Sequence, residues 1–318
     1  MDKPSSHSIR KNRIADRNGN VDSVWHTLLR FIDSSKIDIV VVSWLDGFVF
    51  NDELLKVKDY VLICYMEYGW NVQLSHTQIW GLNTHEHEKF NTDEWRKFDE
   101  WVANNPPRLT LKRELLKQDV SYYLKAIDYP CTLPKYEVVS ESQFNARPLD
   151  FFFYWGRSSE YRVQLHGDIW KGASKYGYNV CDNLYFFDAF MRNESGRKVV
   201  TLNIPHYVRT DISHLMAINS ASKISIAPYG AGRKTFRHLE SSTNAVMLMY
   251  EDRLSWAYEW EHGVNCLKCE PTKELETIYD YFNQKDLYDI YRNGVETADK
   301  YRVQNYLNNY IQPLIDKL

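Results

Sequence analysis

Short hydrophobic runs alternate along this chain with longer stretches whose apolar residues recur at helical spacing. The runs Ile37–Ser43, Tyr60–Tyr65 and Asp150–Trp155 are unbroken and rich in β-branched or aromatic residues, which is typical of strands buried on both faces. Ser23–Ile32 and Thr92–Val102 instead have the spacing of amphipathic helices. Strands that alternate with helices indicate an α/β fold built on parallel sheets with helices on both faces.

The same alternation continues through the second half of the chain. Further strands are expected at Val199–Ile204, Lys223–Pro228 and Val246–Tyr250. The expected helices cover Tyr161–Tyr176, His214–Ala221, the end of Tyr229–Asn244, Lys273–Phe282 and Leu287–Leu318. In the first half, the pattern also predicts a helix over Asn51–Lys58, and it leaves Arg108–Lys117 open between strand and helix.

The length and one irregular segment predict two domains. A chain of 318 residues is longer than one hydrophobic core usually covers. Lys135–Arg147 is polar and irregular, and we interpret it as a linker. We therefore expect an N-terminal domain over residues 1–146 and a C-terminal domain over 147–300. Residues 301–318 are expected to form a helix that packs back towards the N-terminal domain.

The composition and the net charge indicate which kinds of molecule the protein could bind. Aromatic residues make up 15% of the chain, with 23 Tyr and 10 Trp, and such rings suit contacts with a sugar or a base as well as a core. The net charge of −3 argues against a protein that binds nucleic acid through bulk charge. A small basic cluster near the N-terminus, Arg10, Lys11, Arg13 and Arg17, is most simply a solvated tail or strand edge.

Cysteine usage and hydropathy bear on the compartment. The five Cys are odd in number and irregularly spaced, so no disulfide framework is predicted. Cys266 and Cys269 form one CxxC, but no second ligand pair follows at the spacing of a zinc site. The first twenty residues have no apolar signal region, and no apolar run is long enough to span a bilayer. A reducing, cytoplasmic location is the expectation.

The segment Ser225–Glu240 carries the strongest chemical signal. A buried strand ends in a loop with Gly230 and Gly232, and a helix begins beyond the loop. Ligands of open α/β sheets bind outside the carboxyl ends of the strands, where glycines let the backbone approach a phosphate. Arg237 and Glu240 share one helix face, so the Arg could bind a diphosphate and the Glu the ribose hydroxyls. The segment is neither a Walker loop nor a dinucleotide fingerprint. The alternative is an ordinary βα turn with an Arg–Glu pair on the helix surface.

The segment Ser222–Glu251 resembles the C-terminal half of GT-B glycosyltransferases, and it is most similar to their exostosin-like and spore-maturation-type groups. The matching residues are Pro228, Gly230, Gly232, Thr235, Arg237 and Glu240. Asp150–Arg162 resembles the opening strand of the same domain. The resemblance implies two Rossmann-like domains with parallel sheets that face a central cleft. It also implies a nucleotide-diphosphate sugar donor, with a UDP-sugar favoured. The predicted donor-binding residues are Gly156, Arg157, Tyr229, Gly230, Gly232, Arg233, Lys234, Thr235, Arg237 and Glu240.

The expected reaction is transfer of the sugar to a hydroxyl acceptor. Gly232 stands where many retaining members of the family have a second Glu, which favours inversion. Inversion needs a base, and Asp46 and Glu67 follow the first two predicted strands. His76, His85 and His87 are further candidates. No DxD motif lies at a plausible strand end, so we predict a metal-independent enzyme with no cofactor besides the donor co-substrate.

The acceptor and the class of protein stay open at this point. The acceptor could be a glycan, a lipid-linked sugar, or a modified DNA base as in viral glycosyltransferases of similar size. A non-catalytic protein that binds a nucleotide-sugar or nucleic acid on the same fold is the main alternative. A phosphoryl-transfer enzyme or epimerase on a similar two-domain frame is disfavoured, because both nucleotide fingerprints are absent.

Overall fold

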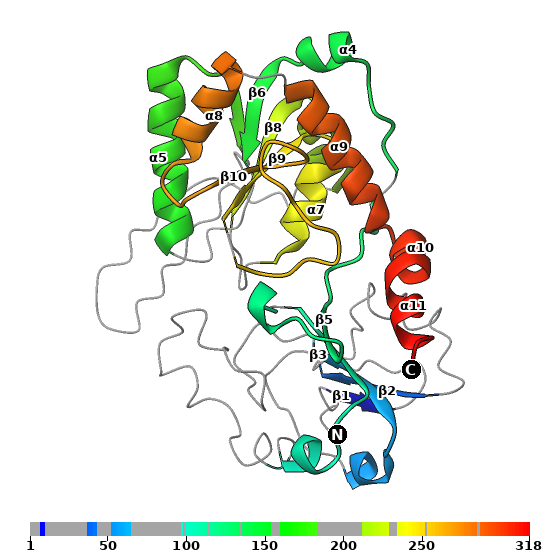
Figure 1. Cartoon of the computed structure of the whole chain (residues 1–318). Helices are drawn as coiled ribbons and strands as arrows, with labels where there is room; N and C mark the ends of the chain where they lie inside the picture. The colour runs from blue at the N-terminus through cyan, green and yellow to red at the C-terminus, as the bar shows by residue number, and fades with distance from the viewer. Residues whose placement is uncertain are drawn as a thin grey trace, which may run out of the picture.

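The computed structural model describes residues 7–9, 37–42, 52–64, 97, 100–113, 115–133, 135–153, 160–182, 212–228, 234–251, 253–284 and 287–318. The described strands form two sheets, one from each half of the chain, and helices surround the second sheet (Figure 1). The α/β class predicted from the alternating pattern is confirmed.

The N-terminal sheet follows the order of the chain. Its strands are β1 (His7–Ile9), β2 (Asp38–Val42), β3 (Tyr60–Cys64), β4 (Leu109–Lys112) and β5 (Leu124–Ala126). β1 is antiparallel to β2, and the other neighbours are parallel. Val61, Leu62 and Ile63 are fully buried, as expected for a parallel strand covered on both faces.

The C-terminal sheet is parallel throughout its described strands. They are β6 (Leu149–Phe153), β7 (Val180–Asp182), β8 (Ser222–Ala227), β9 (Val246–Tyr250) and β10 (Leu267–Cys269). The spatial order is β10-β9-β8-β6-β7. Numbered along this half of the chain and taken from the other edge, this is the order 2-1-3-4-5 of doubly wound flavodoxin-like sheets. The direction of strand addition therefore reverses between β6 and β8.

Helices cover both faces of the C-terminal sheet. The longer ones are α5 (Glu160–Tyr176), α6 (Ile212–Ser220), α8 (Glu274–Gln284) and α9 (Leu287–Lys300). The shorter elements are α4 (Glu141–Asn145), α7 (Phe236–Ser242), α10 (Val303–Tyr306), η4 (Leu307–Ile311) and α11 (Gln312–Ile315), with the turns η1 (Asp52–Lys56) and η3 (Lys117–Asp119).

Strand β9 shows how the period-two alternation divides the core. Val246 and Leu248 point to a cluster with residues of α5, α8 and the first part of α9. Met247 and Met249 point the other way, to a cluster that also contains residues of β3, β4 and the C-terminal helices. One continuous hydrophobic core therefore joins one face of the C-terminal sheet to the N-terminal sheet.

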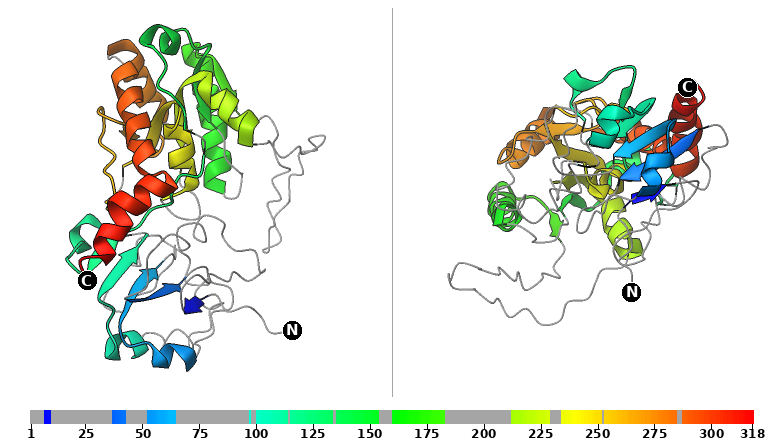
Figure 2. Two further views of the ribbon diagram at one scale, coloured as in Figure 1. Left: turned by 90° about the vertical axis from the view of Figure 1, so that its right-hand side faces the viewer. Right: turned by 90° about the horizontal axis from the view of Figure 1, so that it is seen from below.

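The last helices run from the C-terminal sheet to the N-terminal one (Figure 2). The backbone N–H of Cys131 donates to the Tyr301 carbonyl at 2.7 Å, and Tyr310 Oη donates to the Ala126 carbonyl at 2.7 Å. A second connection between the two halves is an isolated antiparallel β-bridge between Leu116 and Leu254. Beside it, the Ser255 N–H donates to the Leu115 carbonyl at 2.7 Å.

Most described elements lie where the hydrophobic pattern predicts them, and the differences have local causes. Arg108–Lys117, left open above, contains strand β4. The predicted helix at Asn51–Lys58 is the short 3-10 turn η1. The segment interpreted as an irregular linker contains helix α4, which begins at Ser140 with a capping box to Gln143. The pattern missed β1, β5, β7 and β10 because each has only three residues.

Candidate functional site

The reversal of strand order places side by side the two strands that precede the predicted ligand-binding segments. β6 and β8 are adjacent and parallel, with Phe153 opposite Ile226 near their carboxyl ends. In doubly wound sheets, ligands bind in the crevice at this switch point. Gly156 and Arg157 follow β6 in the chain, and Tyr229, Gly230, Gly232 and Arg233 follow β8; these six residues lie outside the described residues.

Helix α7 begins directly beyond the loop that follows β8. The backbone N–H of Thr235 donates to Nδ1 of His238 at 3.1 Å, which satisfies an N–H group at the helix start. Nδ1 also lies 3.2 Å from the Thr235 carbonyl oxygen, so the ring packs against the Thr235 backbone at the first turn of α7. His238 therefore fixes where α7 begins, and with it the direction of the side chains that α7 carries.

The predicted Arg237–Glu240 pair forms on α7. Nη1 of Arg237 lies 3.2 Å from Oε2 of Glu240. The guanidinium carbon lies 5.1 Å from the ring centroid of Phe152, which places Arg237 beside strand β6. The Arg237 side chain is 9% exposed and the Glu240 side chain 25% exposed. The pair thus lies against the sheet at the switch point, and the cation is not a solvated surface group.

Lys234 has a partner that the sequence did not indicate. Its ammonium lies 2.5 Å from Oδ1 of Asp128 and donates to the carbonyl of Ser255 at 2.5 Å. The Lys234 and Asp128 side chains are 1% and 2% exposed. The ammonium also lies 4.8 Å from the ring centroid of Trp256. Its predicted contact with the donor stays a prediction, but in this structure the charge is compensated by a carboxylate from the other half of the chain.

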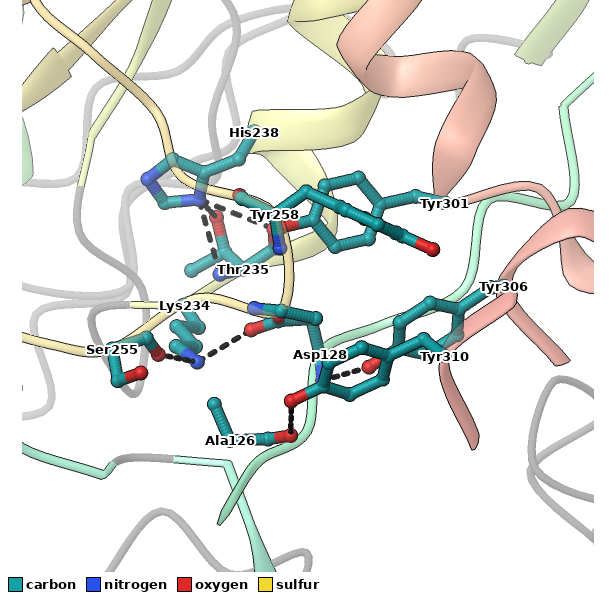
Figure 3. A network of polar contacts seen from close by, with 11 residues as sticks. Ala126, Asp128, Lys234, Thr235, His238, Ser255, Tyr258, Tyr301, Tyr306 and Tyr310 are labelled. Atoms are coloured by element: carbon teal, nitrogen blue, oxygen red, sulfur yellow. Dashed lines mark hydrogen bonds and ion pairs between the residues drawn. The ribbon is translucent and has the colours of Figure 1, made fainter. Parts of the chain in front are cut away.

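Asp128 is held from several sides (Figure 3). Its Oδ2 accepts from the backbone N–H of Ala257 at 2.6 Å, and its own backbone N–H donates to Oη of Tyr306 at 2.8 Å. Four segments distant in sequence therefore meet at Asp128. Asp128 follows strand β5, which is too short to be predicted from the hydrophobic pattern. The only signal in the sequence was a carboxylate flanked by apolar residues, in Ala126–Tyr129.

Burial sets the protonation of His238. The side chain is 1% exposed, and burial lowers its pKa from 6.5 to about 4. The contact of the ring with the Thr235 carbonyl, to which a protonated imidazole would donate, opposes this shift, whereas the charges of Lys234 and Arg237 add to it. The imidazole is therefore neutral at physiological pH, and Thr235 has a constant hydrogen-bond acceptor.

The candidate bases Asp46 and Glu67 lie outside the described residues, as do His76, His85 and His87. The structure does place the strands that precede the two carboxylates. β2 and β3 are adjacent and parallel, with Val42 opposite Cys64 at their carboxyl ends. Asp46 and Glu67 thus follow neighbouring strand ends, and their catalytic role stays a prediction.

The two cysteines of the CxxC motif belong to different hydrophobic clusters. Cys266 belongs to the cluster that reaches the N-terminal sheet, whereas Cys269 belongs to the cluster on the other face. Both are free thiols, and burial raises the pKa of Cys269. Among the residues that the structure describes, no group of His, Cys, Asp or Glu could hold a metal ion. None of the helices in this described part is long and apolar enough to cross a membrane.

Of three comparisons with known proteins, only the comparison with solved structures found matches. No family model matches the sequence, and no curated protein matches it. Solved structures do match, among them the glycotransferase of kitacinnamycin, which is 9% identical with a TM-score of 0.42. That match covers 83% of this chain and 72% of the other. At this level of similarity, the likeness decides neither the fold nor the function.

Proposed function

We propose that this protein is a glycosyltransferase of GT-B type that binds a nucleotide-diphosphate sugar, with a UDP-sugar favoured, at the carboxyl ends of β6 and β8. The observation that carries the proposal is the position of the Arg237–Glu240 pair. It lies on the helix that follows β8, beside Phe152 of β6, and hence at the switch point of a doubly wound sheet.

The two side chains match the two parts of such a donor. A guanidinium binds phosphoryl oxygens through charge-assisted and often bidentate hydrogen bonds. A carboxylate accepts hydrogen bonds from the two hydroxyls of a ribose. The contact between Arg237 and Glu240 fixes the guanidinium before the ligand arrives, which lowers the entropy lost on binding. Gly156, Arg157, Tyr229, Gly230, Gly232 and Arg233 are proposed to complete the donor site.

The proposed reaction is an inverting transfer without a metal. A carboxylate, Asp46 or Glu67, accepts the proton of the acceptor hydroxyl, whose oxygen attacks the anomeric carbon. The bond from that carbon to the diphosphate oxygen breaks on the opposite face, and the nucleoside diphosphate leaves. Arg237 and Arg157 stabilise the charge that develops on the leaving group. The proposed acceptor is a glycan or a modified DNA base.

The test begins with ligand binding to the whole chain. A thermal-shift screen against nucleotides and nucleotide-sugars should show a rise in melting temperature with a nucleoside diphosphate, because the ligand binds only the folded state. Calorimetry then measures the affinity for UDP. Absence of binding to every nucleoside diphosphate and nucleotide-sugar would refute the proposal.

Hydrolysis of the donor separates an enzyme from a protein that only binds. A transferase slowly releases UDP from a UDP-sugar in the absence of acceptor, whereas a pure binder does not. Asp46→Asn and Glu67→Gln should each leave UDP binding intact, and the variant that removes the base should abolish turnover. Full turnover in both variants would exclude these two carboxylates as the base.

A further inference from the structure

The ion pairs that join the two halves of the chain differ in burial. Lys234 and Asp128 are almost completely buried, at 1% and 2% exposure, and their charged atoms lie 2.5 Å apart. Lys117 and Glu259 lie 3.1 Å apart, but their side chains are 50% and 52% exposed. The exposed pair contributes little because water and salt screen it. The buried pair is the stronger constraint on how the two halves meet.

The hydrogen bonds around the buried pair allow one arrangement of the segments. Each carboxylate oxygen of Asp128 has its own donor, Lys234 on Oδ1 and the Ala257 N–H on Oδ2. The Lys234 ammonium also donates to the Ser255 carbonyl. A shift of one segment would leave a buried charge without its partner, and such a loss is far more costly than loss of a surface pair.

The buried ion pair is connected through the start of α7 to the proposed donor-binding side chains. Lys234 is followed in the chain by Thr235, whose N–H is held by His238 in the first turn of α7 (Figure 3). That same turn carries Arg237, and Glu240 follows on the same face. Lys234, whose ammonium contacts Asp128 at the end of the N-terminal sheet, is therefore only three residues before Arg237.

We propose that Asp128 and Lys234 are positioning residues, whose buried ion pair holds α7 with Arg237 and Glu240 at a fixed place relative to the N-terminal sheet. This inference rests on the proposed function, in which the donor is bound by the C-terminal sheet and the base follows a strand of the N-terminal sheet. The pair touches neither reacting group. It sets the distance between them, so it acts on turnover more than on donor affinity.

The test uses the double variant D128N/K234M, which removes both charges and leaves neither group buried without a counter-charge. The amide oxygen introduced at position 128 can still accept from the Ala257 N–H, and the methionine side chain fills the space of the lysine stem. The probes are UDP for binding and, for hydrolysis, the UDP-sugar that raises the melting temperature most. The matched control is K117M/E259Q, which removes the exposed ion pair between the same two halves.

Turnover and affinity should separate in the double variant. We expect hydrolysis to fall by about ten- to a hundredfold, because small displacements of reacting groups cost that much. The affinity for UDP should stay within about threefold, because the Lys234 ammonium is already paired with Asp128 and the Ser255 carbonyl. A larger loss of affinity would place Lys234 in the donor site, as the sequence predicts, and would overturn the positioning role. The control should keep both values. Equal losses of affinity and turnover would show a merely structural role and overturn the proposal, as would unchanged turnover.

Hydrogen exchange gives a readout that does not depend on activity. In D128N/K234M, amides of residues 128–131, 234–242 and 253–258 should exchange about tenfold faster or more, whereas those of β3 and β9 should keep their protection. The control variant should show no such change. If the wild type binds no nucleotide, the proposed function fails, but exchange still decides whether this pair couples the two halves. Unchanged exchange in all three segments would overturn the coupling.

Discussion

The ammonium of Lys234 lies 2.5 Å from the carboxylate of Asp128, a residue 106 positions earlier in the chain. The pair joins the start of α7 to the end of the N-terminal sheet, and both side chains are excluded from water. Because α7 also carries Arg237 and Glu240, the proposed nucleotide site is tied to the other half of the molecule. The stability of the fold and the proposed function are thus linked at this ion pair.

The first prediction concerns the stability of that pair. Asp128→Asn and Lys234→Met should each lower the free energy of unfolding by about 3–5 kcal/mol, because each leaves a buried charge unpaired. The double variant should lose less than the sum, with a coupling free energy of about 1–3 kcal/mol. Denaturant unfolding of the four proteins measures this cycle. Lys117→Met, in the exposed pair, should stay within about 1 kcal/mol of wild type. Additive losses at Asp128 and Lys234 would show that the two charges do not interact.

The second prediction concerns pH and follows from His238. Its pKa is lowered to about 4 in the folded protein, so between pH 6.5 and 4 the unfolded chain binds a proton that the folded chain does not. The stabilisation from neutral His238 is complete above pH 6.5 and is lost as the pH falls towards 4. The loss over this interval is on the order of 3 kcal/mol.

His238→Gln isolates that contribution. Gln at the third helical position accepts from the same backbone N–H in a capping box, but it does not titrate in this interval. The melting temperature of the variant should therefore fall less steeply than that of the wild type as the pH drops from 6.5 to 4. Parallel curves for the two proteins would contradict the lowered pKa.

A third prediction compares two glycines with the same backbone angle. Gly263 and Gly177 both have φ of 73°, in the left-handed region that L-residues rarely adopt. A Cβ on Gly263 would lie 2.9 Å from Oη of Tyr281, whereas one on Gly177 would meet nothing within 4 Å. Gly177→Ala should cost about 1–2 kcal/mol from the angle alone.

Gly263→Ala should cost more than Gly177→Ala, because the added carbon also displaces Tyr281 from His262. The two side chains are hydrogen-bonded at 2.9 Å, and His262 Nδ1 accepts from the N–H of Lys268 in β10. Thermal unfolding of both variants checks the order. Equal losses would show that Tyr281 moves aside freely.

The sequence was sufficient for the strands and helices that are long and strongly patterned. Tyr60–Tyr65 and Lys223–Pro228 are continuous apolar runs, and a parallel sheet buried on both faces requires such runs. The Arg237–Glu240 contact also followed from helical spacing alone. These features are local, because each depends on residues that are close in the chain.

The sequence did not show the contacts that form between segments distant in the chain. Asp128 lies in a short apolar stretch with no periodicity, and its partners come from three other parts of the chain. The order of strands in the C-terminal sheet is likewise a tertiary property, and without it the carboxyl ends of β6 and β8 could not be placed side by side. Cys266 directly precedes β10 and Cys269 ends it, and this strand, which directs the two side chains into different clusters, was too short to predict.

The last prediction concerns Arg237, whose guanidinium is proposed to bind the donor diphosphate. Arg237→Ala should weaken UDP binding by on the order of 2–4 kcal/mol, because a charge-assisted contact to a desolvated diphosphate is lost. Arg237→Lys should recover only part of the affinity, since an ammonium cannot bind two oxygens in the planar geometry of a guanidinium. Arg292→Ala is the matched control, because Arg292 forms an i,i+3 pair with Asp289 on the exposed face of α9. Calorimetry with UDP, on variants first shown by melting to be folded, measures all three. Wild-type affinity in Arg237→Ala would remove this residue from the donor site, whereas a loss in Arg292→Ala would show an indirect effect of removing positive charge.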